Sequence, residues 1–196
     1  MQPKSTKNIA IFASGTGTNA VNICQYFLNN PSVEVITLVC NKPKAKVIEN
    51  IKPFELVVHL IDQTDFKNPK KLIERIKEQQ IDLLVLAGFL WLIPKALIEA
   101  FPNKIINLHP ALLPKYGGKG MYGVKVHQAV IEHKESESGI TIHYVNEHYD
   151  EGGIIFQAKT VVDKNETVES LSEKIHQLEY EHFPKVIEQL LINKQF

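Results

Sequence analysis

The chain has 196 residues, which is enough to bury a sizeable hydrophobic core within one domain. Lysine plus arginine and aspartate plus glutamate both number 22, so the formal net charge is zero and the basic excess typical of nucleic-acid binders is missing. No apolar run reaches the ~20 residues of a membrane-spanning helix, and the first residues lack an apolar signal region, so we expect a cytoplasmic protein that binds neither nucleic acid nor membranes.

The first half of the chain alternates apolar strands with helices. The predicted strands cover residues 8–13, 33–40, 56–61, 83–87 and 105–108. The predicted helices between them cover residues 18–29, 69–80 and 94–101. Such a strand–helix–strand alternation predicts a parallel sheet with right-handed crossover connections.

The pattern changes after Pro114. A glycine-bearing loop, a short helix, two strands with antiparallel-type alternation and a closing helix follow, at residues 115–125, 126–133, 138–145, 154–162 and 168–192. The whole chain therefore predicts an α/β fold, with an open, mostly parallel twisted sheet, helices on both faces, and antiparallel strands near the carboxyl-terminal part.

The motif Ser14-Gly-Thr-Gly-Thr-Asn19 lies between the first strand and the first helix. Glycines allow a tight turn, and the N–H groups of the following helix start then point outward, where they attract phosphate. The motif lacks the third glycine of a dinucleotide fingerprint and the Gly-Lys-Ser/Thr of a P-loop. A plain glycine turn capped by Thr18 is the alternative.

Asn107 and His109 are the reactive polar side chains of the fifth strand. They are two residues apart, so they point to the same face of an extended chain, and Pro110 ends the strand after them. Ligands of open α/β sheets bind at this carboxyl end. An asparagine amide can donate to an oxyanion, and a histidine can accept or donate a proton near neutral pH.

Asp150 lies in the turn between the two late strands, and a carboxylate near His109 would orient the imidazole and favour its protonated form. The three residues are therefore candidate catalytic groups. The alternatives remain that Asp150 is a turn former, His109 a hydrogen-bonded core histidine and Asn107 a strand-end cap.

The other histidines predict no metal site. His59 and His143 fall in strand patterns and are expected to be structural. Four others are expected at the surface or on helices: His127, His133, His148 and His182. Cys24 and Cys40 fit a reduced compartment, and no His-x₃-His or Cys-x₂-Cys pair with metal-ligand spacing occurs.

Together these motifs resemble the folate-dependent formyltransferases. The run Asn107–Pro114 resembles the family signature, and Asp150-x-Gly152 resembles its aspartate loop. Leu86–Phe89 and the motif at 14–19 complete a pattern whose order covers almost the whole chain.

The resemblance implies an enzyme of purine synthesis that transfers the formyl group of 10-formyltetrahydrofolate to the amine of glycinamide ribonucleotide, without a metal. It implies one domain over 1–196, with a nucleotide-binding half at 1–108 and a folate and catalytic half at 109–196, as a monomer or homodimer. Two alternatives stay open: a family member that uses another amine acceptor, and a nucleotide-binding module without catalysis.

The resemblance also implies a place for each substrate. The ribonucleotide would be held by Gly17, Thr18, Asn19, His176, Gln177, Leu178 and Glu179. The folate would be held by Leu90, Trp91, Leu92, Ile93, Asn107, Asn146, Glu147, His148, Tyr149 and Asp150. Asn107, His109 and Asp150 would be catalytic, with Asp150 raising the pKa of His109 so that a protonated imidazole stabilises the oxyanion.

Some positions depart from the family pattern. The loop after Gly118 is about four residues longer than is common, and Val126 stands where a histidine often opens the next helix, with His127 one place on. Trp91 stands where a basic residue is frequent, and Gly153 where a proline is frequent.

Overall fold

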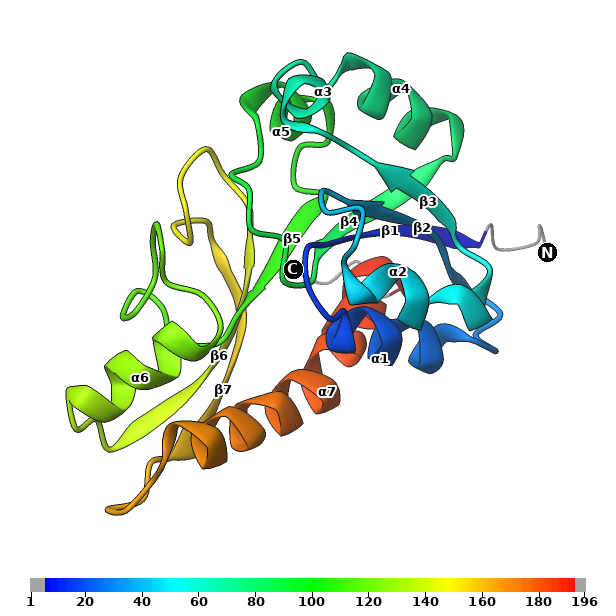
Figure 1. Cartoon of the computed structure of the whole chain (residues 1–196). Coiled ribbons are helices and arrows are strands. Elements are labelled where there is room, and N and C mark those ends of the chain that lie inside the picture. The colour runs from blue at the N-terminus through cyan, green and yellow to red at the C-terminus, as the bar shows by residue number, and fades with distance from the viewer. Residues whose placement is uncertain (1–5, 193–196) are drawn as a thin grey trace.

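The structure is a computed structural model that describes residues 6–192 (Figure 1). Its seven strands form one sheet with the order β3-β2-β1-β4-β5-β6-β7. The strands are β1 Lys7–Ala13, β2 Val33–Cys40, β3 Val57–Leu60, β4 Ile81–Leu86, β5 Ile105–His109, β6 Glu137–Tyr144 and β7 Ile154–Val161. The first five pair in parallel, and β6 and β7 are antiparallel, as the sequence predicts.

The strand order reverses between β1 and β4. From β1 the chain builds outward through β2 to β3, and it then returns to add β4 and β5 on the other side. The loops that leave the carboxyl ends of β1 and β4 therefore diverge to opposite sides of the sheet. Such a switch point opens a crevice for ligands.

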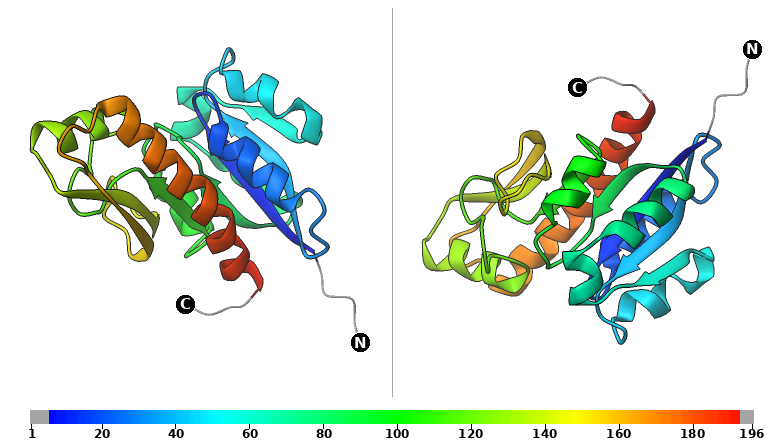
Figure 2. Two further views of the ribbon diagram at one scale, coloured as in Figure 1. Left: turned by 90° about the horizontal axis from the view of Figure 1, so that it is seen from below. Right: turned by 90° about the horizontal axis from the view of Figure 1, so that it is seen from above.

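Helices cover both faces of the sheet. The helices are α1 Thr18–Phe27, α2 Lys46–Asn50, α3 Gln63–Lys67, α4 Lys70–Glu78, α5 Lys95–Ala100, α6 Val124–Glu132 and α7 Val168–Ile192, with a 3-10 turn η1 at Lys52–Phe54. One hydrophobic core contains residues of α1, α2, α6 and α7, and a second contains residues of α3, α4 and α5. Figure 2 shows α7 running alongside α1, which it contacts, on one face of the sheet.

Burial explains why the central strands read as continuous apolar runs. Residues 9–13 of β1 are fully buried, because β1 has a neighbouring strand on each side and a helix layer on each face. In contrast, most residues of β7 at the edge of the sheet are only partly buried or exposed. A large apolar side chain, such as those that β1 buries, stabilises the fold by about 1.5–3 kcal/mol when it is fully buried.

The predicted elements are confirmed with boundary shifts of up to two residues. Two of them, β2 and α7, have the predicted bounds, whereas β5 continues one residue further, through His109. The sequence patterns missed α2, α3 and η1, because helices of five and three residues are too short to show a periodicity. A local signal for α3 does exist, since the Asp62 carboxylate caps the N–H groups of Thr64 and Asp65.

None of the described helices is long and apolar enough to cross a membrane. Within residues 6–192, no group of three or more His, Cys, Asp or Glu side chains is arranged to hold a metal ion.

Candidate active site

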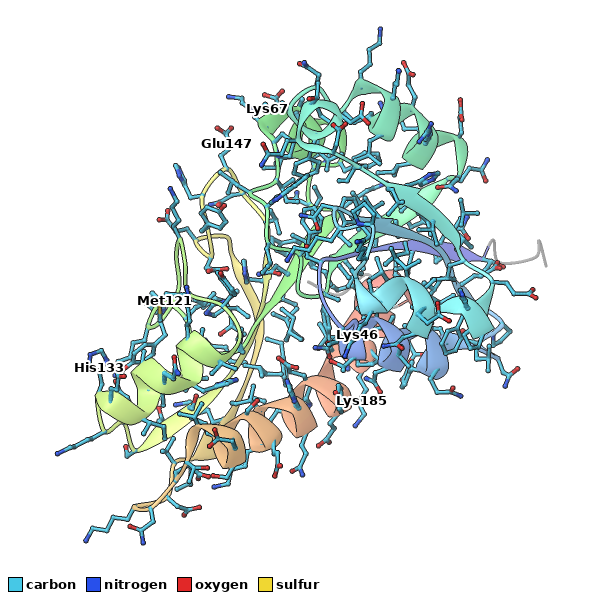
Figure 3. The ribbon with its side chains drawn as sticks, in the orientation of Figure 1. Lys46, Lys67, Met121, His133, Glu147 and Lys185 are labelled. Atoms are coloured by element: carbon cyan, nitrogen blue, oxygen red, sulfur yellow. The ribbon has the colours of Figure 1, made fainter. Side chains whose placement is uncertain are left out.

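A cavity of about 590 Å³ opens at the carboxyl ends of β1, β4 and β5. Most of its walls come from the glycine loop before α1, the segment after β4, the end of β5, the loop before α6, the β6–β7 connection, and α7. In Figure 3, Met121 marks the loop before α6 and Glu147 marks the β6–β7 connection. The cavity therefore lies at the carboxyl end of the sheet, where the sequence predicted a ligand site, and beside the switch point between β1 and β4.

Asn107 and His109 enter this cavity from β5, as their spacing predicted. His109 is buried and Asn107 is partly buried. Asp150 joins them from the β6–β7 connection, with its Oδ2 atom 3.5 Å from Nδ1 of His109 and its Oδ1 atom 3.4 Å from Nδ2 of Asn107. The structure thus brings all three candidate catalytic side chains together.

The carboxylate of Asp150 is held in place by its backbone and its partners. Its φ of 57° lies in the left-handed region, which few non-glycine residues adopt and which is often seen at functional sites. The N–H of Gly118 donates to Oδ2 at 2.9 Å. Burial raises the pKa of Asp150, but the contacts with His143, His109 and Gly118 outweigh burial, so the pKa lies below its usual value and the group is ionised at neutral pH.

His109 is fixed by a backbone carbonyl. Its Nε2 atom lies 2.8 Å from the carbonyl oxygen of Tyr116, and a carbonyl only accepts, so Nε2 carries the proton. In the neutral ring, Nδ1 then presents a lone pair toward Asp150 and can accept a proton there.

Two opposing effects act on the pKa of His109. Burial lowers this pKa, and although Asp150 acts to raise it, as expected, the net direction is downward. The effect of the carboxylate can be expected from the sequence, whereas the burial of His109 cannot, because burial at the end of β5 depends on the packing around it. The lowered pKa favours the neutral ring in the free protein at neutral pH.

His143 belongs to the site although the sequence suggested a structural role. It lies directly opposite Asn107 in the β5–β6 register. Its Nδ1 donates to the carbonyl of Tyr144 at 2.8 Å, which leaves Nε2 to accept from the Asn107 amide at 3.1 Å. A histidine in a strand pattern was the available signal, but the register that places it against Asn107 cannot be read from one sequence.

The glycine loop forms one end of the cavity. Gly17 has a φ of 75° and precedes the first residue of α1, and no side chain caps this helix. The first helical N–H with a protein acceptor is that of Val21, which donates to Gly17. In the described part of the chain, the preceding N–H groups of Thr18 and Asn19 have no protein acceptor and can meet an anion.

Asn19 faces a buried carboxylate on α7. Its Nδ2 donates to Oε2 of Glu179 at 2.8 Å, and His176 lies 4.0 Å from the same oxygen. Burial raises the pKa of Glu179. Residues three apart share one helix face, so His176 and Glu179 both line the cavity, whereas Gln177 and Leu178 do not.

The candidate folate residues divide in the same way. Those that line the cavity are Leu90, Trp91, Leu92, Ile93, Asn107, His148, Tyr149 and Asp150. Asn146 and Glu147 do not line it: Asn146 accepts from the N–H of His148 within the turn, and Glu147 pairs with Lys95 at 3.2 Å. Trp91 packs beside Phe66, with ring centroids 5.5 Å apart.

Sequence reasoning missed two further cavity residues, His127 and Lys42. His127 was expected at the surface or on a helix, and it does lie on α6, but it is buried. It thus places a histidine in the cavity although Val126 occupies the usual register. Burial, together with the nearby His176 and His109, lowers its pKa to about 4.

Comparisons with known proteins agree along almost the whole chain. The formyl transferase family matches residues 7–187. Phosphoribosylglycinamide formyltransferase of Bacillus subtilis (strain 168) is 36% identical over 190 residues, which cover 94% of this chain and 95% of that relative. The crystal structure of phosphoribosylglycinamide formyltransferase from Bacillus halodurans superposes with a TM-score of 0.86 at 35% identity and covers 96% of this chain and 97% of its own.

A plant relative is longer. The chloroplastic phosphoribosylglycinamide formyltransferase of Arabidopsis thaliana is 38% identical over 188 residues, which cover 92% of this chain. The same match covers 64% of the plant protein, so this chain spans less than two thirds of that relative's length.

Proposed function

This chain belongs to the formyl transferase family, and from that premise we propose that it transfers the formyl group of 10-formyltetrahydrofolate to the amine of glycinamide ribonucleotide. The products are formylglycinamide ribonucleotide and tetrahydrofolate, and the reaction is a step of purine synthesis. The observation that carries the proposal is the meeting of Asn107, His109 and Asp150 in the cavity at the switch point.

The two ends of the cavity suit the two substrates. We place the ribonucleotide phosphate at the α1 N-terminus, where Gly17, Thr18 and Asn19 offer backbone donors. The ribose and glycinamide part then lies against His176 and Glu179. The folate occupies the apolar end, against residues 90–93 and 148–150, since flat aromatic ligands favour mostly apolar walls.

His109 acts first as a base. The substrate amine attacks the formyl carbon, a C–N bond forms, and the carbonyl electron pair moves to oxygen. The proton released by the amine moves to Nδ1 of neutral His109, directly or through a water, because Nε2–H is already bound to Tyr116. The resulting imidazolium is stabilised by the ionised Asp150.

The second half of the reaction returns this proton. The oxyanion re-forms the carbonyl, the bond from the formyl carbon to N10 of the folate breaks, and the His109 proton passes to N10. Asn107 donates to the oxyanion through the N–H that otherwise makes its longer contact, 3.4 Å, with Asp150. The other N–H of its amide stays bound to His143 at 3.1 Å.

As for assembly, we propose that the enzyme works in the cytoplasm as a monomer or homodimer, with the two small molecules as its substrates and no nucleic-acid or membrane partner.

A formyl-transfer assay tests the proposal. The purified chain is mixed with 10-formyltetrahydrofolate and glycinamide ribonucleotide, and the folate absorbance is followed. We expect turnover that requires the ribonucleotide and stops without an acceptor. Turnover with another amine, such as an amino-sugar nucleotide, but not with glycinamide ribonucleotide would overturn the acceptor assignment. No turnover with any amine would overturn the enzymatic one.

A further inference from the structure

The contact between His109 and Tyr116 raises the question of what holds the Tyr116 carbonyl in position. Tyr116 has a φ of 58°, in the left-handed region that a tyrosine seldom adopts. Relaxation to negative φ would rotate the backbone and turn the carbonyl away from Nε2 of His109. Something outside the cavity must therefore keep this residue in its strained conformation.

The Tyr116 ring is clamped by polar side chains at the end of α6. Its hydroxyl lies 2.9 Å from Oε1 of Glu135 and 3.1 Å from Nδ1 of His133. A carboxylate only accepts, so the hydroxyl proton goes to Glu135 and His133 donates to the hydroxyl oxygen. The His133 ring also packs on the Tyr116 ring, with centroids 5.6 Å apart (His133 is labelled in Figure 3).

Lys115 completes this group. Its Nζ atom lies 2.9 and 3.1 Å from the two carboxylate oxygens of Glu135. The contact with Lys115 lowers the pKa of Glu135 most, and the hydrogen bond from the Tyr116 hydroxyl lowers it further. Glu135 is therefore ionised and remains an acceptor for Tyr116 at neutral pH. We call Lys115, Tyr116, His133 and Glu135 the tyrosine clamp.

The clamp bears on the proton of His109 because two acceptors compete for it. Asp150, 3.5 Å from Nδ1, favours the tautomer with the proton on Nδ1, which cannot act as a base toward the cavity. The Tyr116 carbonyl, at 2.8 Å from Nε2, favours the opposite tautomer, which can. Without the carbonyl, Asp150 is the nearest acceptor and the inert tautomer gains.

We propose that Tyr116 is a positioning residue for the formyl transfer: its carbonyl selects the basic tautomer of His109, and the tyrosine clamp keeps the carbonyl in place. The inference rests on the proposed function only for its effect on the rate. The selection of the tautomer is a property of the free protein and can be measured without substrates.

The chain offers matched controls. Tyr26→Phe removes a tyrosine hydroxyl of α1 that donates to Glu188 of α7 at 2.7 Å, and neither residue lines the cavity. Glu137→Gln breaks a surface pair with Lys159 at 2.8 Å, close in sequence to Glu135. Each control removes the same kind of contact as Tyr116→Phe or Glu135→Gln without touching the clamp.

The first measurement is ¹⁵N NMR of the His109 ring in the full chain. In the wild type and in both controls we expect the tautomer with the proton on Nε2. In Tyr116→Phe and Glu135→Gln we expect a mixture that contains the Nδ1–H form. Backbone amide spectra check that each variant is folded. An unchanged His109 tautomer in both clamp variants would overturn the proposal, whatever the activity.

The second measurement is steady-state kinetics. In both clamp variants kcat should fall about tenfold, a part of the 10²–10⁴-fold that a positioned acid–base group contributes, while the KM for the ribonucleotide stays nearly unchanged. The hydrogen bond from His109 to the Tyr116 carbonyl raises the pKa of His109. Its loss should therefore lower this pKa and move the acid limb of the rate profile to lower pH. The groups that face His109 in that titration are Asp150, His143 and His127.

The outcomes separate the two proposals. A lower kcat together with the mixed tautomer supports the clamp. Wild-type kcat in both clamp variants, or a lower kcat with an unchanged tautomer, overturns it. If the wild type does not formylate glycinamide ribonucleotide, the proposed function fails, and the NMR result alone then decides whether the clamp selects the tautomer.

Discussion

At the scale of single residues, two carbonyl oxygens decide which nitrogen of each site histidine carries its proton. Tyr116 binds Nε2–H of His109, and Tyr144 binds Nδ1–H of His143. The two rings therefore present their lone pairs in different ways: His109 toward Asp150, and His143 toward the amide of Asn107. One ring is left free to take a proton, and the other orients a hydrogen-bond donor.

Replacing the carboxylate tests its role directly. We expect Asp150→Asn and His109→Ala to reduce kcat by at least ~10²-fold, since each removes part of an acid–base pair. Asp163→Asn is the control, because Asp163 is an exposed carboxylate that pairs with Lys174 at 2.6 Å, and neither residue lines the cavity. Folded Asp150→Asn with wild-type kcat at neutral pH would show that the assigned role is wrong.

The titration of His109 can be followed on its own. Its folded pKa is lowered, so the ring takes its proton at a pH below the ordinary midpoint of 6.5 and is neutral above it. Asp150 raises this pKa, so Asp150→Asn should move the midpoint lower still. NMR of the His109 ring carbons between about pH 4 and 8 measures the midpoint in the wild type and in Asp150→Asn. A wild-type midpoint above the ordinary value would contradict the proposal that His109 starts the reaction as a neutral base.

At the scale of elements, the start of α1 depends on one glycine. An added Cβ at Gly17 would lie 2.2 Å from Cγ2 of Val47, and the φ of 75° would strain any other residue. At Gly15, two positions earlier, an added Cβ meets nothing within 4 Å. The two glycines look alike in the sequence, so the sequence could not have told which one the fold requires.

This contrast gives a paired test. Gly17→Ala should destabilise the fold by about 1–2 kcal/mol or more, as expected for a left-handed non-glycine residue, and should weaken ribonucleotide binding more than folate binding. Gly15→Ala should leave the stability nearly unchanged. Thermal unfolding measures the stability of each variant, and calorimetry measures its affinity for each ligand. An equal loss of affinity for both ligands in Gly17→Ala would contradict the placement of the ribonucleotide phosphate at the start of α1.

The predicted loop over residues 115–125 follows β5, and its last two residues belong to the first turn of α6. Its residues 118–123 line the cavity, and Tyr122 remains 46% exposed. We expect this loop to close over the formyl group when both substrates bind, with Met121 or Tyr122 excluding water. Hydrogen exchange with the ribonucleotide and a non-reactive folate analogue should show increased protection, and no increase in the ternary complex would leave the loop as a surface insertion.

At the scale of the whole molecule, α7 joins the two halves of the chain. It packs on α1 in the first half and on α6, β6 and β7 in the second, and Asn22 and Asn30 donate to its residues. The halves at 1–108 and 109–196 therefore share one core on this face of the sheet. On this face neither half covers its apolar residues alone, whereas the buried residues of the second core all belong to the first half.

One cooperative transition should follow from this shared core. In urea, the fluorescence of Trp91 in the first half and the far-ultraviolet circular dichroism of the whole chain should change together. The fragment 1–108 should remain unfolded by the same dichroism. A Trp91 transition that clearly precedes the other would show instead that the halves are separate folding units.

How far the sequence could predict this molecule depended on the range of the interactions. Local signals were enough for the strands, the long helices, and the pairing of Asn107 with His109 on one strand. The signature resemblance supplied Asp150 and Glu179, which lie far along the chain. The burial of His127 and the contact of His143 with Asn107 depend on helix packing and strand register, which one sequence does not reveal.

The position of Glu179 on α7 also has a consequence for synthesis. Chains are made amino end first, so β1 through β5, with Asn107 and His109, leave the ribosome well before α7 does. Until then, the face of the sheet that α7 covers is exposed to aggregation and to chaperones, and the cavity lacks the wall that carries His176 and Glu179. A nascent chain therefore covers this face and completes its cavity in the same event, when its last long helix docks.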